Sequence, residues 1–143
     1  MKEKIGITGT FFLKVFENGR LIDQFEENNL VVTTGKEAAV LLLGGDGAGK
    51  QITNIGFGTS GAASLLSMTA LTGLYSKALE DITYPAAESL KADFVLEEAE
   101  NNGVTIQEFG LICSDGTLFS RLTRYPIEKT NSIRLEGSWI INL

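Results

Sequence analysis

The feature that most constrains the fold is a two-residue alternation of apolar and polar side chains that recurs along much of the chain. The clearest such segments begin at Ile7, Leu90 and Ile133, and each has apolar residues at nearly every second position. This period is that of a β-strand with one buried face. Asn18-Gly19 and Asp115-Gly116 favour the tight turns that join such strands into hairpins. The pattern predicts a mainly β chain, an antiparallel β-sandwich or flattened barrel with one short helix.

One segment, residues 34–44, is instead predicted to form a helix. Thr34 and Glu37 have the spacing of a capping box, in which Thr34 covers a free backbone N–H and Glu37 reaches back. The run that follows is rich in alanine and leucine, which are strong helix formers, and Gly44-Gly45 provides a C-terminal stop. Because the run is apolar throughout, we expect this helix to pack across the open end or face of a sheet.

The phase of the later strands predicts which of their residues are buried. The strand that begins at Val104 changes phase before Phe109, and a β-bulge at 107–108 is the device that allows such a slip. The new phase places Cys113 on the core face, and the phase of the last strand does the same for Trp139. We expect both to be buried, with Cys113 acting only as a small apolar side chain. Residues 75–84 are read as one strand.

Composition excludes several classes of function. With 143 residues and no linker-like segment, we expect a single β-rich domain over 1–143. The chain has no histidine and one cysteine, which removes histidine-based catalysis, histidine-ligated zinc and internal disulfides. Its net charge of −6 argues against binding nucleic acid, and its longest apolar run is far shorter than a membrane helix needs. We therefore predict no enzyme activity, no catalytic or metal-binding residues and no cofactor.

Three local motifs resemble functional sites but also fit ordinary turn structure. Residues 44–50 resemble a P-loop, but Gln51 stands where serine or threonine is needed, and the expected helix precedes the glycines instead of following them. Residues 56–61 match G-x-G-x-x-G, yet no convincing helix follows to carry a phosphate. The acidic turn at 97–100 lacks the ligand spacing of calcium loops. We expect residues 44–50 to be a flexible loop, residues 56–61 to be a strand end with a tight turn, and residues 97–100 to be a solvated turn.

Two apolar stretches are the candidate assembly surface. Residues 59–74 are read as an irregular loop that is apolar for a loop, and Phe12 and Phe16 lie opposite the core face of the first strand. Either both stretches cover the core, with the phenylalanines packed under a curled loop, or both are exposed and form a protein–protein contact. The candidate residues are Phe12, Phe16, Leu65, Leu66, Met68 and Leu71.

Three segments in the order of the chain resemble tailed-phage tail-collar and tail fibre proteins. Gln51-Ile-Thr-Asn-Ile-Gly-Phe-Gly-Thr-Ser60, followed by Thr69-Ala-Leu-Thr72 and Tyr75, resembles their "I-x-x-I-A-x-G-x-G … T-A-L-x-x-x-x-Y" stretch. Gly103-Val-Thr-Ile-Gln-Glu-Phe-Gly-Leu-Ile112 with Asp115-Gly-Thr-Leu118 resembles "G-x-T-I-R-E-I-G-L-F-x-x-D-G-x-L". Tyr125-Pro126-Ile-Glu-Lys129 resembles the closing "Y-P-P-x-x-K". The likeness covers residues 29–143.

In that family such a region is the virion-proximal domain that attaches the fibre to the tail or baseplate. Family members continue into a shaft and a receptor-binding tip, whereas this chain stops at Leu143, and it begins with an extra hairpin over residues 7–26. The resemblance therefore implies a structural or attachment component of a phage or prophage-derived particle. It would be made in the bacterial host cytoplasm and located in the virion, with other tail proteins or copies of itself as partners. The alternative is a stand-alone carbohydrate- or peptide-binding β-sandwich.

Overall fold

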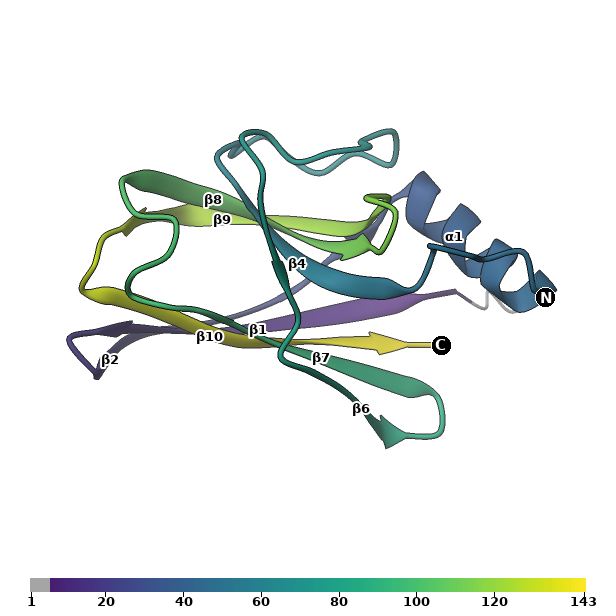
Figure 1. Cartoon of the computed structure of the whole chain (residues 1–143), viewed down its shortest axis with the longest axis horizontal. Coiled ribbons are helices and arrows are strands. Elements are labelled where there is room, and N and C mark those ends of the chain that lie inside the picture. Colours follow the sequence, from purple (N-terminus) through teal and green to yellow (C-terminus); the bar gives the residue numbers. More distant parts are fainter. Residues whose placement is uncertain (1–5) are drawn as a thin grey trace, which may run out of the picture.

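The computed structural model describes residues 6–143, which form two five-stranded antiparallel sheets packed face to face, with one helix at an end of the sandwich (Figure 1). This confirms the predicted β-sandwich with one short helix. Sheet A has the order β2-β1-β10-β7-β6. Its strands are β1 (Thr8–Glu17), β2 (Arg20–Asn28), β6 (Asp81–Ala86), β7 (Ser89–Leu96) and β10 (Ile133–Asn142).

Sheet B has the order β3-β9-β8-β4-β5. Its strands are β3 (Leu30–Val31), β4 (Ile52–Gly58), β5 (Tyr75–Ala78), β8 (Val104–Cys113) and β9 (Leu118–Lys129). The pairing of β8 with β9 shifts register between Ile106 and Glu108, which confirms the predicted bulge. Residues 75–84 are two strands and not one: the chain leaves sheet B after β5 and joins sheet A as β6, so the predicted single strand was wrong.

The core lies between the sheets and is rich in aromatic rings. The ring centroids of Phe11 from sheet A and Phe109 from sheet B are 4.8 Å apart, and those of Phe94 and Phe57 are 6.1 Å apart. Trp139 is fully buried against Phe11, as its phase predicted. Burying each such side chain contributes about 1.5–3 kcal/mol, so this cluster is a main source of the stability of the sandwich.

Helix α1 (Thr33–Gly44) connects the two-residue strand β3 to β4 and lies beyond the ends of the sheets (Figure 1). The predicted capping box was wrong: Val32 is the N-cap, and no side chain among the described residues caps this end. The Thr34 hydroxyl donates instead to the carbonyl of Leu118 on β9, 2.7 Å away. The predicted C-terminal stop is confirmed, with Gly45 in the left-handed conformation at φ 83°.

Gly35, which has no side chain, allows α1 to approach β9 closely. A Cβ on Gly35 would lie 2.0 Å from the carbonyl oxygen of Phe119, so no other residue fits there without moving the helix. No helix within residues 6–143 is long and apolar enough to cross a membrane.

Candidate assembly surface

Helix α1 packs on the sandwich through the first half of its length, and its last turn exposes apolar side chains around the helix axis. Gly35 and Ala38 are its buried residues, whereas Val40 is 67% exposed and Leu43 is 89% exposed. Leu41 and Leu42 are also exposed. A helix that is apolar on all sides at the end of a sandwich can cover only one side by packing on the sheets. The other side remains as an apolar surface that the isolated fold does not need.

The loop over residues 59–74 lies against the first turn of α1 and exposes two further apolar side chains. The backbone carbonyl of Leu66 accepts a 2.9 Å hydrogen bond from the N–H of Thr33, which holds the loop against the first turn of α1. Leu65 and Leu66 are 57% and 46% exposed. We call the side chains of Val40, Leu41, Leu42, Leu43, Leu65 and Leu66 the α1 surface. Val40, Leu41, Leu42 and Leu43 are consecutive and therefore lie about 100° apart around the helix, so the exposed apolar side chains surround the last turn of α1.

The six predicted surface residues do not lie together. Leu71 is buried and Met68 is partly buried, because both pack on the outer side of sheet B with Val32, Ile112 and Leu118. Phe12 and Phe16 are half-buried on the outer face of sheet A, the opposite sheet. The loop therefore does cover a sheet face, but the expectation that the phenylalanines pack under it was wrong. Only Leu65 and Leu66 of the predicted set contribute to the α1 surface.

A buried ion pair holds this loop on sheet B. Glu108 on β8 accepts a hydrogen bond from Nε of Arg121 on β9 at 2.7 Å, and both side chains are 1% exposed. The other carboxylate oxygen of Glu108 accepts the N–H groups of Thr72 at 2.6 Å and Ser60 at 3.3 Å. Nη1 of Arg121 donates to the carbonyl of Ala62 at 2.9 Å. These bonds connect both ends of the loop to one pair of charges.

We call the Glu108–Arg121 pair with its hydrogen bonds to the loop the clamp. The clamp was not predicted from the sequence, although the glycines of β4 and β8 are a signal for it. On β4 and β8 the outward positions beside Glu108 are glycines, which is unusual for a solvated strand face. A Cβ on Gly56 would lie 3.0 Å from a methyl carbon of Leu71, and one on Gly58 would lie 2.3 Å from a carboxylate oxygen of Glu108. These glycines of the G-x-G-x-x-G stretch thus make room for the loop and its clamp.

The P-loop-like segment also has a structural role here. It connects α1 to β4, the reverse of the order that the nucleotide motif requires. The ammonium group of Lys50 lies 2.7 Å from the carboxylate of Asp115 and 3.0 Å from the hydroxyl of Thr117. The hydrogen bond from Lys50 lowers the pKa of Asp115 well below its usual value. The pair ties the glycine segment to the β8–β9 turn.

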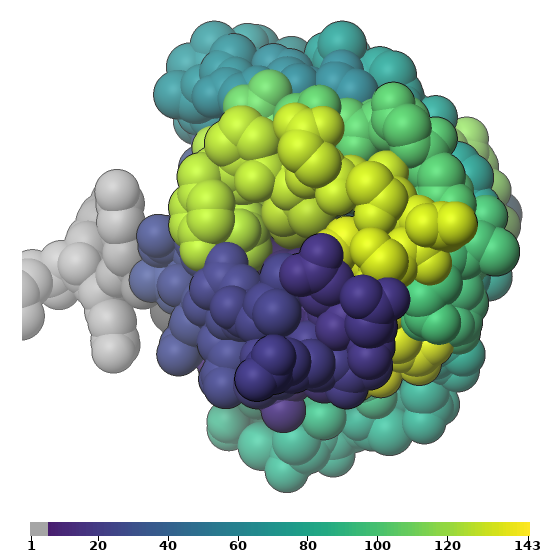
Figure 2. Space-filling model, turned by 90° about the vertical axis from the view of Figure 1, so that its left-hand side faces the viewer, coloured from purple at the N-terminus to yellow at the C-terminus, as the bar shows by residue number. Residues whose placement is uncertain are grey.

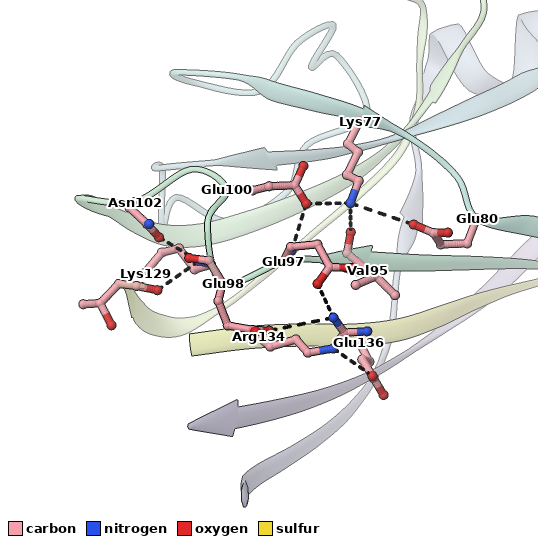
Figure 3. Close-up of polar contacts among 11 residues, drawn as sticks. Lys77, Glu80, Val95, Glu97, Glu98, Glu100, Asn102, Lys129, Arg134 and Glu136 are labelled. Carbon is pink, nitrogen blue, oxygen red and sulfur yellow. Dashed lines mark hydrogen bonds and ion pairs between the residues drawn. The ribbon is translucent and has the colours of Figure 1, made fainter. Parts of the chain in front are cut away.

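At the end opposite α1, the β1–β2 hairpin and the chain between β9 and β10 lie side by side (Figure 2). The acidic turn between β7 and β8 is at this end and takes part in an ion-pair network (Figure 3). Glu100 contacts the ammonium of Lys77 at 2.6 Å, and Glu97 pairs with Arg134. Glu98 and Ala99 are exposed, which confirms the expected solvated turn, although the ion pairs of this turn were not predicted. No group of three or more metal-ligating side chains occurs in the part of the chain that the structure describes.

A buried lysine, Lys129, also holds the acidic turn between β7 and β8. Lys129 is 1% exposed, and its ammonium donates to the carbonyls of Glu98 and Thr130 and to the side-chain oxygen of Asn102 at 2.8–3.1 Å. Burial lowers the pKa of Lys129, because it disfavours the charged form. Three oxygens around one ammonium make this a structural site that is already filled.

Acidic side chains cap the edge strands of sheet A. On β2, Asp23 accepts the N–H of Gln24 at 2.8 Å and Glu27 accepts that of Asn28 at 3.0 Å. On β6, Asp81 accepts the N–H of Ile82 at 2.9 Å. Sheet B has edge strands of two and four residues, β3 and β5. Capped or short edges discourage the addition of a further strand, so edge pairing is a poor route to assembly for this fold.

The outer face of sheet A has a depression that a ligand could enter. It has a volume of about 410 Å³ and runs across β2, β1, β10 and β7. Phe12, Lys14, Glu26, Asp93 and Glu136 are among its lining residues. One aromatic ring with several polar groups is a composition that suits a polar ligand. The three carboxylates outnumber the single ammonium, so the depression is acidic.

Comparison with known proteins identifies no relative of this chain. No family model matches the chain, and no curated protein and no solved structure is significantly similar to it. The likeness to tail fibre proteins therefore rests on the motif residues alone.

Proposed function

We propose that this protein is a non-enzymatic structural or attachment component of a bacteriophage tail, tail fibre or baseplate, or of a prophage-derived particle, and that it acts through protein–protein contacts. The observation that carries the proposal is the α1 surface. It exposes the apolar side chains of four consecutive helix residues, together with Leu65 and Leu66, at one end of a sandwich whose core is otherwise well covered. Such a surface is typical of a protein that docks a neighbouring subunit.

The motif residues behind the resemblance support the proposal in a second way. Glu108 belongs to the "G-x-T-I-x-E" stretch and holds the loop that carries Leu65 and Leu66. Asp115, in the same motif segment as Glu108, holds the glycine segment, and Lys129, in the third motif segment, holds the acidic turn. In this chain the motifs therefore maintain the shape of the sandwich and position the α1 surface, as expected of a structural module.

The proposal is tested by following the chain into particles. Particles from cells that produce it are separated on a density gradient, and we expect the wild-type chain to sediment with them. A Val40→Glu/Leu43→Glu variant should fold, because both side chains point into solvent, yet should stay at the top of the gradient.

The matched control is Tyr84→Glu/Leu143→Glu, which adds the same two charges at residues that are 74% and 73% exposed. This control should enter particles like the wild type. If the wild-type chain never sediments with particles, or if both double variants enter them equally, the proposal is wrong.

The depression on sheet A favours one alternative, a carbohydrate-binding module. Phe12 would contact a sugar ring while the carboxylates and Lys14 accept and donate hydrogen bonds. A glycan array checks this alternative. Binding that is lost in Phe12→Ala and kept in Val40→Glu/Leu43→Glu would favour it over assembly through the α1 surface.

A further inference from the structure

We infer that Asn18, in the turn between β1 and β2, is a site of spontaneous deamidation, and that the fold protects Asn102 from the same reaction. The inference is independent of the proposed function. An asparagine followed by glycine occurs twice in the chain, as Asn18-Gly19 and as Asn102-Gly103. The local sequence therefore gives the two sites the same reactivity, and it is the structure that distinguishes them.

The reaction uses the backbone nitrogen of the following residue as the nucleophile. At the first site, the Gly19 nitrogen loses its proton to solvent and attacks the side-chain carbonyl carbon of Asn18. A C–N bond forms, the bond to the side-chain nitrogen breaks, and that nitrogen leaves as ammonia. Solvent water then opens the five-membered imide to give aspartate or isoaspartate. Glycine permits this attack best, because it has no side chain to hinder its nitrogen.

At the first site both reacting groups are free. Asn18 and Gly19 are exposed, and both have positive φ, 49° and 79°, as in a two-residue type I′ turn. Among the described residues, no partner accepts a hydrogen bond from the Gly19 N–H. The turn must open for the nitrogen to reach the side chain, and this breaks the hydrogen bond from the Asn18 N–H to the carbonyl of Ser132. It uncovers little else, since residues 17–20 are already exposed.

At the second site both reacting groups are held by Lys129. The Gly103 N–H donates to the backbone carbonyl of Lys129 at 2.8 Å, and the side-chain oxygen of Asn102 accepts from its ammonium, also at 2.8 Å (Figure 3). Lys129 is 1% exposed, so opening this turn would take an acceptor away from a buried charge, which is costly. This turn should therefore open less often than the β1–β2 turn, and deamidation, which proceeds from the open state, should be slower.

The product changes the turn in which it forms. Isoaspartate carries the main chain through its Cβ, which adds one atom to a two-residue turn that places Glu17 opposite Arg20. We expect this end of the hairpin to open, so that the peptide bond after Arg20 becomes more accessible to trypsin.

Ageing the purified chain tests the assignment. One sample is kept folded in mildly alkaline buffer, and a second is kept unfolded in urea. Peptide mapping follows the mass gain of about 1 Da that marks each deamidated asparagine. In the folded chain Asn18 should react more than about tenfold faster than Asn102, and in urea the two rates should agree within about threefold.

Asn18→Gly is the matched control, because glycine also adopts positive φ and lacks the reactive amide. Trypsin should cut aged wild-type protein after Arg20 faster than fresh protein, and should cut the variant equally fast before and after ageing. Equal rates at Asn18 and Asn102 in the folded chain, no reaction at Asn18, or the same preference for Asn18 in urea would overturn the inference. An unchanged rate of cleavage in aged wild-type protein would refute the opening of the turn.

Discussion

The carboxylate of Glu108 and the guanidinium of Arg121 meet at 2.7 Å with both side chains 1% exposed, on what would otherwise be the solvated face of sheet B. They are buried because the loop over residues 59–74 lies on them and uses their remaining hydrogen-bonding capacity. The pair thus couples the folding of sheet B to the position of Leu65 and Leu66. A surface that is to dock a partner gains from such fixed placement, because less ordering is needed on binding.

Arg121→Met should destabilise the protein by about 3–5 kcal/mol, since it leaves Glu108 buried without a counter-charge. The loop should also become a protease site, because its carbonyl acceptors lose their donor. Urea denaturation and limited proteolysis measure both effects. Glu108→Gln/Arg121→Met should recover part of the stability, as no unpaired charge remains. If Arg121→Met lowers the free energy of unfolding by no more than Arg20→Met, which changes an exposed arginine, the clamp does not stabilise the protein.

Glu100 makes stability depend on pH at the opposite end of the sandwich. Burial acts to raise the pKa of Glu100, but hydrogen bonds from Lys77 and the Glu97 N–H outweigh it and hold the pKa below its ordinary value of 4.5. A carboxyl whose pKa is lower in the folded state contributes stability above that ordinary value and loses it as pH falls through the folded pKa.

Glu100→Gln should therefore reduce the free energy of unfolding at pH 7 and flatten its decline below about pH 4.5. Urea unfolding at a series of pH values measures this slope. Glu88→Gln, on an exposed glutamate, should keep the wild-type slope. Equal slopes for wild type and Glu100→Gln would show that the ion pair contributes nothing to acid stability.

Cys113 is 2% exposed, and burial raises the pKa of its thiol to about 11. The native protein should react with a thiol reagent only as fast as it unfolds, whereas the Val40→Cys thiol should react at once. Cys113→Ala should cost on the order of 1 kcal/mol through a small cavity and leave assembly intact. Rapid labelling of the native wild-type chain would refute the burial.

The capped edges of sheet A yield a separate prediction. Glu27→Thr/Asp81→Thr removes two carboxylates that cover edge N–H groups and raises β-propensity at both strands. This variant should aggregate through its sheets, which thioflavin binding detects. Glu37→Thr, which removes a carboxylate from α1, should remain thioflavin-negative. If the edge variant is also thioflavin-negative, the caps do not protect the edges.

The two-residue alternation of apolar and polar side chains predicted much of the sandwich but little of its surface. Burial of Phe11, Trp139 and Cys113 follows from two-residue phase alone, because a strand fixes which side each residue faces. The capping box failed because Thr34 found an acceptor on β9, 84 residues away in sequence. The clamp and the α1 surface depend on contacts between distant segments, and no local window contains both partners.

The central claim, that the α1 surface is a protein interface in an assembled particle, is tested most directly by site-specific photo-cross-linking. A photoreactive phenylalanine analogue replaces Val40 in one variant and Tyr84 in another, both of which are well exposed. Each variant is irradiated in purified particles, and the cross-linked chains are identified by mass spectrometry. We expect position 40 to cross-link to this chain or to another structural protein of the particle, and position 84 to give little product. Equal yields at the two positions, or no product at position 40 in particles that contain the protein, would contradict the claim.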